Sequence, residues 1–138
     1  MANRSNQRVK VAETIAALKH QTGARVVVLG PVPAWRRGLP NEVLRHFMLY
    51  HRLIPERWNG AVSSNWYDEV MSARLVPAGA EFISAWEALC NADGCLTRTG
   101  DSAGDISASD QVHLTEKGSV YLTGAIIDRV LGGPAVRP

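Results

Sequence analysis

The sequence predicts an α/β domain built around a parallel β-sheet, and three observations support this fold class. Residues 25–30 are a short run with the β-branched composition of a buried strand, and residues 79–84 are a second run expected to form a short strand. Stretches with a helical periodicity of apolar side chains separate these runs and flank them. The resulting order, which is helix, strand, helix, helix, strand, loop, helix, contains the alternation found in βαβ units. A chain of 138 residues has room for one such domain.

The N-terminal half is expected to place the first strand between two helices. Residues 7–20 form the first helix, and Gly23 follows as a common helix stop. Its apolar face consists of Val9, Ala12, Ile15, Ala16 and Leu18. Residues 25–30 are then expected to form a strand buried on both faces, and two prolines keep the segment after it extended. A second helix is expected over residues 39–53, with an apolar face of Val43, Leu44, Phe47, Met48 and Tyr50.

The C-terminal half is expected to contain one more strand and two more helices. Residues 55–64 are irregular, and residues 65–75 form a helix that turns Trp66, Val70 and Met71 inward. After the strand at 79–84, residues 85–109 are mostly loop, with one small hairpin around Cys95. Residues 116–131 form the last helix, with Thr115 as its N-cap. Its apolar face consists of Val120, Leu122, Ile126, Ile127, Val130 and Leu131.

Only two strands are therefore expected, and they make a poor core, because parallel sheets need several strands covered on both faces. This indicates that partner strands come from elsewhere. We expect one domain over residues 1–133, which ends at Gly132-Gly133-Pro134, and a flexible tail over residues 134–138.

Composition and charge exclude several classes of function. The formal net charge of +2 and the scattered Lys and Arg residues argue against nucleic acid. Arg36-Arg37 is the only basic doublet, so a phosphate-binding patch is not expected. No apolar run reaches the roughly 18 residues of a membrane span, and the polar N-terminus lacks a signal peptide. Read alone, the chain is expected in the cytoplasm.

The remaining Cys, His and Trp residues leave some alternatives open. Cys90 and Cys95 flank a turn-forming Asn-Ala-Asp-Gly, so that a disulfide, which would suit an oxidising compartment, and two free thiols are equally expected. His46 and His51 are five residues apart, on different faces of a helix, and no metal or other cofactor is expected. The four tryptophans are expected to pack in or around the core, with a sugar or acyl pocket as the alternative.

The most informative stretch is Asp110-Gln-Val-His113, followed by Leu-Thr-Glu-Lys-Gly-Ser-Val-Tyr-Leu. A carboxylate and an imidazole three residues apart on one loop can meet. The carboxylate then accepts the ring N–H, and the other ring nitrogen is free to act as a base toward a serine hydroxyl. The stretch resembles the last sequence block of the SGNH (GDSL-type) esterases, in which the Asp and His of the triad precede the C-terminal helix. This resemblance implies that His113 is the general base and Asp110 its orienting carboxylate.

Two further segments resemble the SGNH domain found fused to membrane O-acyltransferases of the acyltransferase-three (AT3) type. They are Val27-Val-Leu-Gly-Pro-Val-Pro-Ala-Trp35 and the cysteine loop that ends in Leu-Thr-Arg98. The resemblance implies a three-layer, flavodoxin-like parallel sheet, of which this chain is the C-terminal portion. It also implies a periplasmic location and O-acyl esters as substrates, such as acetyl groups on a cell-surface glycan, either hydrolysed or transferred.

The earlier blocks of the family are missing from this sequence. The family's nucleophilic serine stands in a Gly-Asp-Ser motif after the first strand, and a Gly-x-Asn-Asp motif supplies oxyanion donors. Gly100-Asp101-Ser102 spells the tripeptide, but it follows no buried strand, and we do not expect Ser102 to be the nucleophile. The chain alone is therefore expected to be inactive, and to associate with a missing N-terminal part or with itself. The alternative is a non-catalytic remnant or interaction module on the same scaffold.

Overall fold

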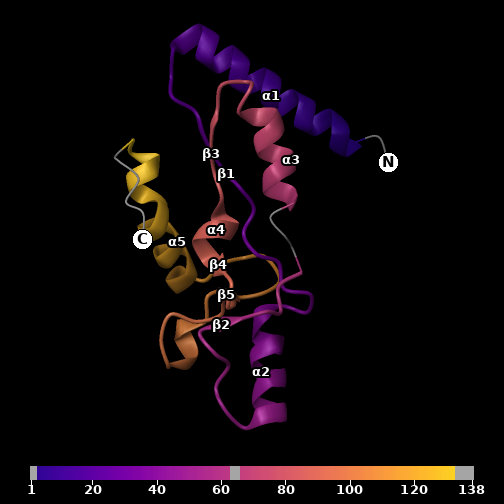
Figure 1. The fold of residues 1–138 in the computed structure, drawn as a ribbon, viewed down its shortest axis with the longest axis vertical. Helices are drawn as coiled ribbons and strands as arrows, with labels where there is room; N and C mark the ends of the chain where they lie inside the picture. Colours follow the sequence, from indigo (N-terminus) through magenta and orange to yellow (C-terminus); the bar gives the residue numbers. More distant parts are fainter. Residues whose placement is uncertain (1–2, 63–65, 133–138) are drawn as a thin grey trace.

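A computed structural model describes residues 3–62 and 66–132 and shows a mixed α/β fold with an elongated outline (Figure 1). Helices α1 and α2 lie at opposite ends of the long axis, and the strands lie between them. The elements are, in chain order, α1 (Asn3–Thr22), β1 (Val27–Leu29), α2 (Leu39–Tyr50), β2 (Arg57–Trp58), α3 (Trp66–Leu75), β3 (Glu81–Ile83), α4 (Ala85–Leu89), β4 (Cys90–Asn91), β5 (Gly94–Leu96), a 3₁₀ turn (Ala103–Asp105) and α5 (Glu116–Val130).

The two predicted strands form the predicted parallel sheet. β1 pairs with β3 from Val27 opposite Glu81 to Leu29 opposite Ile83. The chain crosses from one strand to the other through α2, β2 and α3. The expectation that β1 is buried on both faces is wrong, because Leu29 is 42% exposed and its neighbours are only half-buried. Among the described residues β1 and β3 pair only with each other, so both outer edges of this sheet, including that of β1, stay open.

A second, antiparallel sheet has the order β2–β5–β4 and holds the region expected to be irregular. The predicted hairpin around Cys95 is present as β4 and β5, whereas β2 and the helix α4 were not predicted. Both are short, and α4 lacks a long apolar period. Ser84 begins α4, because its hydroxyl accepts the backbone N–H of Glu87 at 2.9 Å.

The predicted apolar face of α2 is wrong. The helix buries Leu39 and His46, whereas Phe47 and Tyr50 are about half exposed and Met48 is 67% exposed. The helix also ends at Tyr50 rather than at residue 53, because His51 adopts a left-handed backbone with φ of 51°. The apolar face is thus present in the sequence, but no described residue covers it.

The other predicted helix faces hold in part. α1 buries Ile15, which packs with Leu75 of α3, while the side chain of Val9 lies outside the described residues. α3 starts at Trp66, which is exposed rather than inward, and Asn65 also falls outside the described residues. α5 begins after Thr115 as predicted. It buries Leu122 and Ile126 but exposes Val120 and Leu131.

The buried apolar residues form three separate clusters rather than one core. One lies between β3, α4 and α5, one around Trp35, and one between α1 and α3. A compact monomer of 138 residues exposes about 7,000 Å². This chain exposes 9173 Å². Its surface is therefore larger than that of a compact domain of its length.

Two further predictions concern the chain's end and the membrane. The stop at residues 133–134 and the tail at 134–138 lie outside the described residues. No helix in the described ranges is long and apolar enough to cross a bilayer.

Candidate functional site

Asp110 and His113 lie on the loop before α5, and their side chains meet. Nδ1 of His113 is 2.7 Å from Oδ2 of Asp110. The other carboxylate oxygen, Oδ1, accepts the backbone N–H groups of Val112 and His113, each at 2.9 Å. The backbone N–H of His113, then that of Val112, and then the His113 ring lower the pKa of Asp110 to about 2. Asp110 is therefore an ionised acceptor across the physiological pH range.

The start of α5 holds this loop from one side. Thr115 caps the helix by accepting the N–H of Gly118 at 3.1 Å, and its hydroxyl donates to the carbonyl of Ile106 at 2.5 Å. A Cβ atom at Gly118 would lie 2.0 Å from the carbonyl oxygen of Ser107, so only glycine fits there. This close approach explains the Thr-x-x-Gly that follows His113 in the sequence.

The turn between β1 and α2 holds the loop from the other side. The N–H of Trp35 donates to the carbonyl of Gln111 at 2.8 Å, and the N–H of Leu39 donates to the carbonyl of Asp110 at 3.1 Å. Gly38 makes the turn with a φ of 82° and lies against the backbone of Asp110. The loop of residues 110–113, called the base-bearing loop below for the proposed role of His113, is therefore held on one side by a turn about 75 residues away in sequence, and its geometry depends on tertiary structure.

The arrangement suits His113 to proton transfer. When Nδ1–H donates to the Asp110 carboxylate, the Nε2 lone pair is free. The side chain of His113 is 75% exposed, and within the described residues its Nε2 makes no hydrogen bond. The Asp110 side chain is 52% exposed. The pair can thus accept a proton from a hydroxyl brought to its open side.

Ser102 is not brought to His113 by any hydrogen bond in the described part of the chain. Its backbone carbonyl accepts the N–H of Asp105 at 3.0 Å, and the Asp105 carboxylate accepts the N–H of Ser102 at 3.0 Å. This reciprocal cap begins the 3₁₀ turn and gives the Gly-Asp-Ser tripeptide a structural role.

The cysteines form a disulfide between directly opposite residues of β4 and β5. This resolves the alternative that the sequence left open. The histidines at positions 46 and 51 do not face each other as ligands: His46 is buried with Nδ1 3.2 Å from the carbonyl of Arg52, and His51 is exposed. Residues 3–62 and 66–132 contain no cluster of His, Cys, Asp or Glu suited to a metal ion.

A second polar pair is buried where β1 and β3 end. Asp68 of α3 accepts the hydroxyl of Ser84 through Oδ2, and its Oδ1 has no partner among the described residues. A Cβ atom at Gly30 would lie 2.5 Å from that Oδ1. The glycine of the strand end therefore lets this carboxylate approach the backbone closely. The pair ties α3 to the start of α4.

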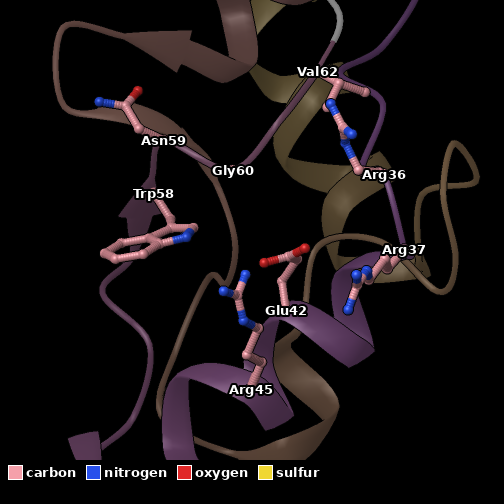
Figure 2. A pocket seen from close by; sticks show the side chains of 8 residues that line it. All are labelled: Arg36, Arg37, Glu42, Arg45, Trp58, Asn59, Gly60 and Val62. Carbon is pink, nitrogen blue, oxygen red and sulfur yellow. The ribbon is translucent and has the colours of Figure 1, made fainter. Parts of the chain in front are cut away.

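A polar pocket of about 390 Å³ lies between the turn after β1, the start of α2 and the β2 segment (Figure 2). It is lined by the arginines Arg36, Arg37 and Arg45, together with Glu42 and Trp58. Sequence patterns do not reveal this pocket, because Arg45 is separated in sequence from the Arg36-Arg37 doublet and Trp58 belongs to another element. The spacing of Glu42 and Arg45 on one face of a predicted helix was the available signal.

The comparisons with known proteins agree with the motifs. The chain matches the model of the SGNH domain fused to AT3 domains over residues 2–128. No curated protein matches it. It is similar to the solved periplasmic domain of lipopolysaccharide acetyltransferase from Salmonella ser. Paratyphi A, with 29% sequence identity and a TM-score of 0.83. The similarity covers 95% of this chain and 51% of that chain, so this chain spans about half its length. The family resemblance and the SGNH-like fold predicted from the sequence are thus confirmed, and the chain belongs to the family of SGNH domains that are fused to AT3 domains.

Proposed function

We propose that this domain acts on O-acyl esters, with His113 as the general base and Asp110 as its orienting carboxylate. The observation that carries the proposal is the 2.7 Å contact between Nδ1 of His113 and the Asp110 carboxylate. In acyl transfer, Nε2 of His113 takes the proton of the attacking hydroxyl and returns it to the leaving alcohol. Asp110 keeps the proton on Nδ1 and stabilises the imidazolium that forms.

The substrate class we propose is an acetyl ester on a cell-surface glycan outside the cytoplasm. The similar Salmonella protein is the periplasmic domain of a lipopolysaccharide acetyltransferase, which supports both the acyl group and the location. The disulfide between Cys90 and Cys95 supports the location independently, because such bonds persist in oxidising compartments.

The nucleophilic serine is proposed to come from outside these 138 residues. The free Nε2 of His113 and the capping role of Ser102 support this assignment. Without a serine the covalent route is closed, and each missing oxyanion donor raises the barrier by about 3 kcal/mol. The chain by itself is therefore expected to be inactive toward esters.

The test compares variants in cells that produce the protein carrying this domain. The O-acetyl content of purified surface glycan is measured after mild alkaline release. His113→Ala is expected to lower acetylation about a hundredfold or more, because general-base catalysis is lost. Asp110→Asn is expected to lower it as well, because the ring tautomer is no longer held. The matched control is His20→Ala, at an exposed position on α1.

Two results would overturn this assignment. Wild-type acetylation by His113→Ala would remove His113 from the chemistry and favour a non-catalytic module on the same scaffold. Hydrolysis of p-nitrophenyl acetate by the 138-residue chain, abolished by Ser102→Ala, would make Ser102 the nucleophile.

A further inference from the structure

Three arginine residues line the polar pocket described above. Arg36 and Arg37 come from the turn after β1, and Arg45 comes from the second turn of α2. Figure 2 shows Arg45 and Glu42 rising from the helix toward the space bounded by Trp58 of β2. The pocket holds about 390 Å³, enough for a single sugar ring with a charged substituent.

The side chains of these arginines are exposed, and their partners among the described residues differ from those of the other arginines. In the described ranges the side chains of Arg36, Arg37 and Arg45 make no ion pair and no hydrogen bond, whereas the guanidinium groups of Arg25 and Arg98 bind carboxylates and carbonyls. The pocket holds three guanidinium groups and one carboxylate, that of Glu42, so positive charge is in excess there, which favours the binding of an anion. Guanidinium groups match carboxylate and phosphate oxygens in a forked geometry, so an anion is the ligand that this pocket fits.

Trp58 forms an aromatic wall of the same pocket. Its ring stands edge-on to the ring of His46, with centroids 5.1 Å apart. A Cβ atom at Gly60 would lie 2.8 Å from Trp58 and 3.3 Å from Trp35, so glycine lets the Trp58 ring settle against its neighbours. The ring is only half-buried. An indole face beside polar donors suits a sugar, whose C–H face is apolar and whose rim is polar.

The pocket is attached directly to the loop that carries the base. The side-chain amide of Gln111 donates to the carbonyl of Arg36 at 3.1 Å, and the N–H of Leu39 donates to the carbonyl of Asp110 at 3.1 Å. The chain segment that presents the arginines is thus the segment that holds Asp110 in place. A ligand bound by the arginines is anchored at a set position relative to His113.

We propose that this pocket is an anion subsite of the substrate, which binds the carboxylate or phosphate group of an acidic sugar residue in the glycan. The inference rests on the proposed function and deepens it, because it names the chemical class of the glycan. The arginines pair with the anionic group, Trp58 stacks on the ring, and the neighbouring acyl ester is held toward His113. The single carboxylate of Glu42 leaves the pocket with an excess of positive charge.

The experiment measures binding to the 138-residue chain, without any need for catalysis. Galacturonate probes a carboxylate, glucose 6-phosphate probes a phosphate, and galactose is the neutral control. Binding is followed by calorimetry and by the NMR signal of the Trp58 indole N–H. At least one acidic sugar is expected to shift this signal, whereas galactose is expected to leave it unchanged. The acid that binds more tightly identifies whether the pocket prefers a carboxylate or a phosphate. Raising the salt concentration is expected to weaken binding.

Variants assign the effect to the pocket. Arg45→Gln and Arg37→Gln are each expected to weaken binding about tenfold or more, because a charge-assisted hydrogen bond is lost. Arg74→Gln, at an exposed position on α3, is the matched control and is expected to leave binding unchanged. Any of three results would overturn the subsite. Galactose binds as tightly as the two acids, neither acid binds, or neither pocket variant changes the binding of the acids.

The outcome is independent of the base assignment. His113→Ala is expected to keep its affinity for the acidic sugar, since among the described residues the imidazole bonds to Asp110 and to none of the residues that line the pocket. Retained binding by this variant together with retained acetylation in cells would refute the base and leave the subsite standing. If His113→Ala loses acetylation in cells and the wild type binds neither acid, the subsite is refuted and the assignment of His113 as the base is retained.

Discussion

Removal of the Cys90–Cys95 disulfide is expected to destabilise the small antiparallel sheet by a predictable amount. The two residues are directly opposite each other in β4 and β5, five positions apart in sequence. In the chain-entropy model, opening a loop of this size lowers the free energy of unfolding by about 2 kcal/mol. The unfolding entropy of a protein of 138 residues is about 0.3 kcal/mol per kelvin. The melting temperature should therefore fall by about 7 °C.

The perturbation also reaches the anion pocket. Cys95 pairs with Trp58 across β5 and β2, and both belong to the apolar cluster around Trp35. Loss of the cross-link loosens β5 and hence the strand that carries Trp58. We expect the indole N–H signal of Trp58 to broaden in the reduced protein well below the melting temperature.

The assay is thermal unfolding followed by circular dichroism. The double variant Cys90→Ala/Cys95→Ala is compared with the wild type, each with and without dithiothreitol. Reductant should lower the melting temperature of the wild type to that of the variant and leave the variant unchanged. A wild type whose melting temperature moves by less than about 2 °C on reduction would refute the loop-entropy reasoning.

Four further predictions follow from single contacts and from the exposed surface. The pKa of Asp110 is about 2 in the folded protein and about 4 in the unfolded chain, so its contribution to stability is present above pH 4 and is lost as the pH falls toward 2. A carboxyl NMR titration with a midpoint near 4 would contradict this. Gly118→Ala should lower the free energy of unfolding by about 1–3 kcal/mol, because its Cβ would meet the carbonyl of Ser107. Gly124→Ala should raise the free energy of unfolding by up to about 1 kcal/mol, because its Cβ would meet no atom within 4 Å. Denaturant unfolding should therefore shift in opposite directions for the two variants. Ser84→Ala removes the N-cap of α4 and the buried hydrogen bond to Asp68, and should lower the free energy of unfolding by about 2 kcal/mol in the same assay. An unchanged unfolding midpoint would exclude a stabilising role for the Ser84 hydroxyl. The open edge of β1 and the 9173 Å² surface predict dimers or larger species in sedimentation experiments, and a monomer with a cooperative melt would argue for a self-sufficient fold.

Local patterns were the part of this fold that the sequence could predict well. The strands at β1 and β3, the start of α5 after Thr115 and the hairpin around Cys95 all depend on residues a few positions apart. The predicted burial of these elements was less successful. The apolar side of α2 reads as a core face, but a helical period shows only that one side is apolar, not that anything covers it.

The sequence by itself determined the family and the meeting of Asp110 with His113, because a carboxylate three residues before a histidine on one loop can reach it without help from the rest of the fold. Only the tertiary structure decided that the cysteines are bonded, that Ser102 caps a turn, and that Arg45 and Trp58 join the Arg36-Arg37 doublet around one pocket. The disulfide and the cap are local, but the sequence left more than one conformation open for each of them. The pocket depends on contacts between elements distant in sequence, and composition and periodicity carry no information on which surfaces such contacts bring together.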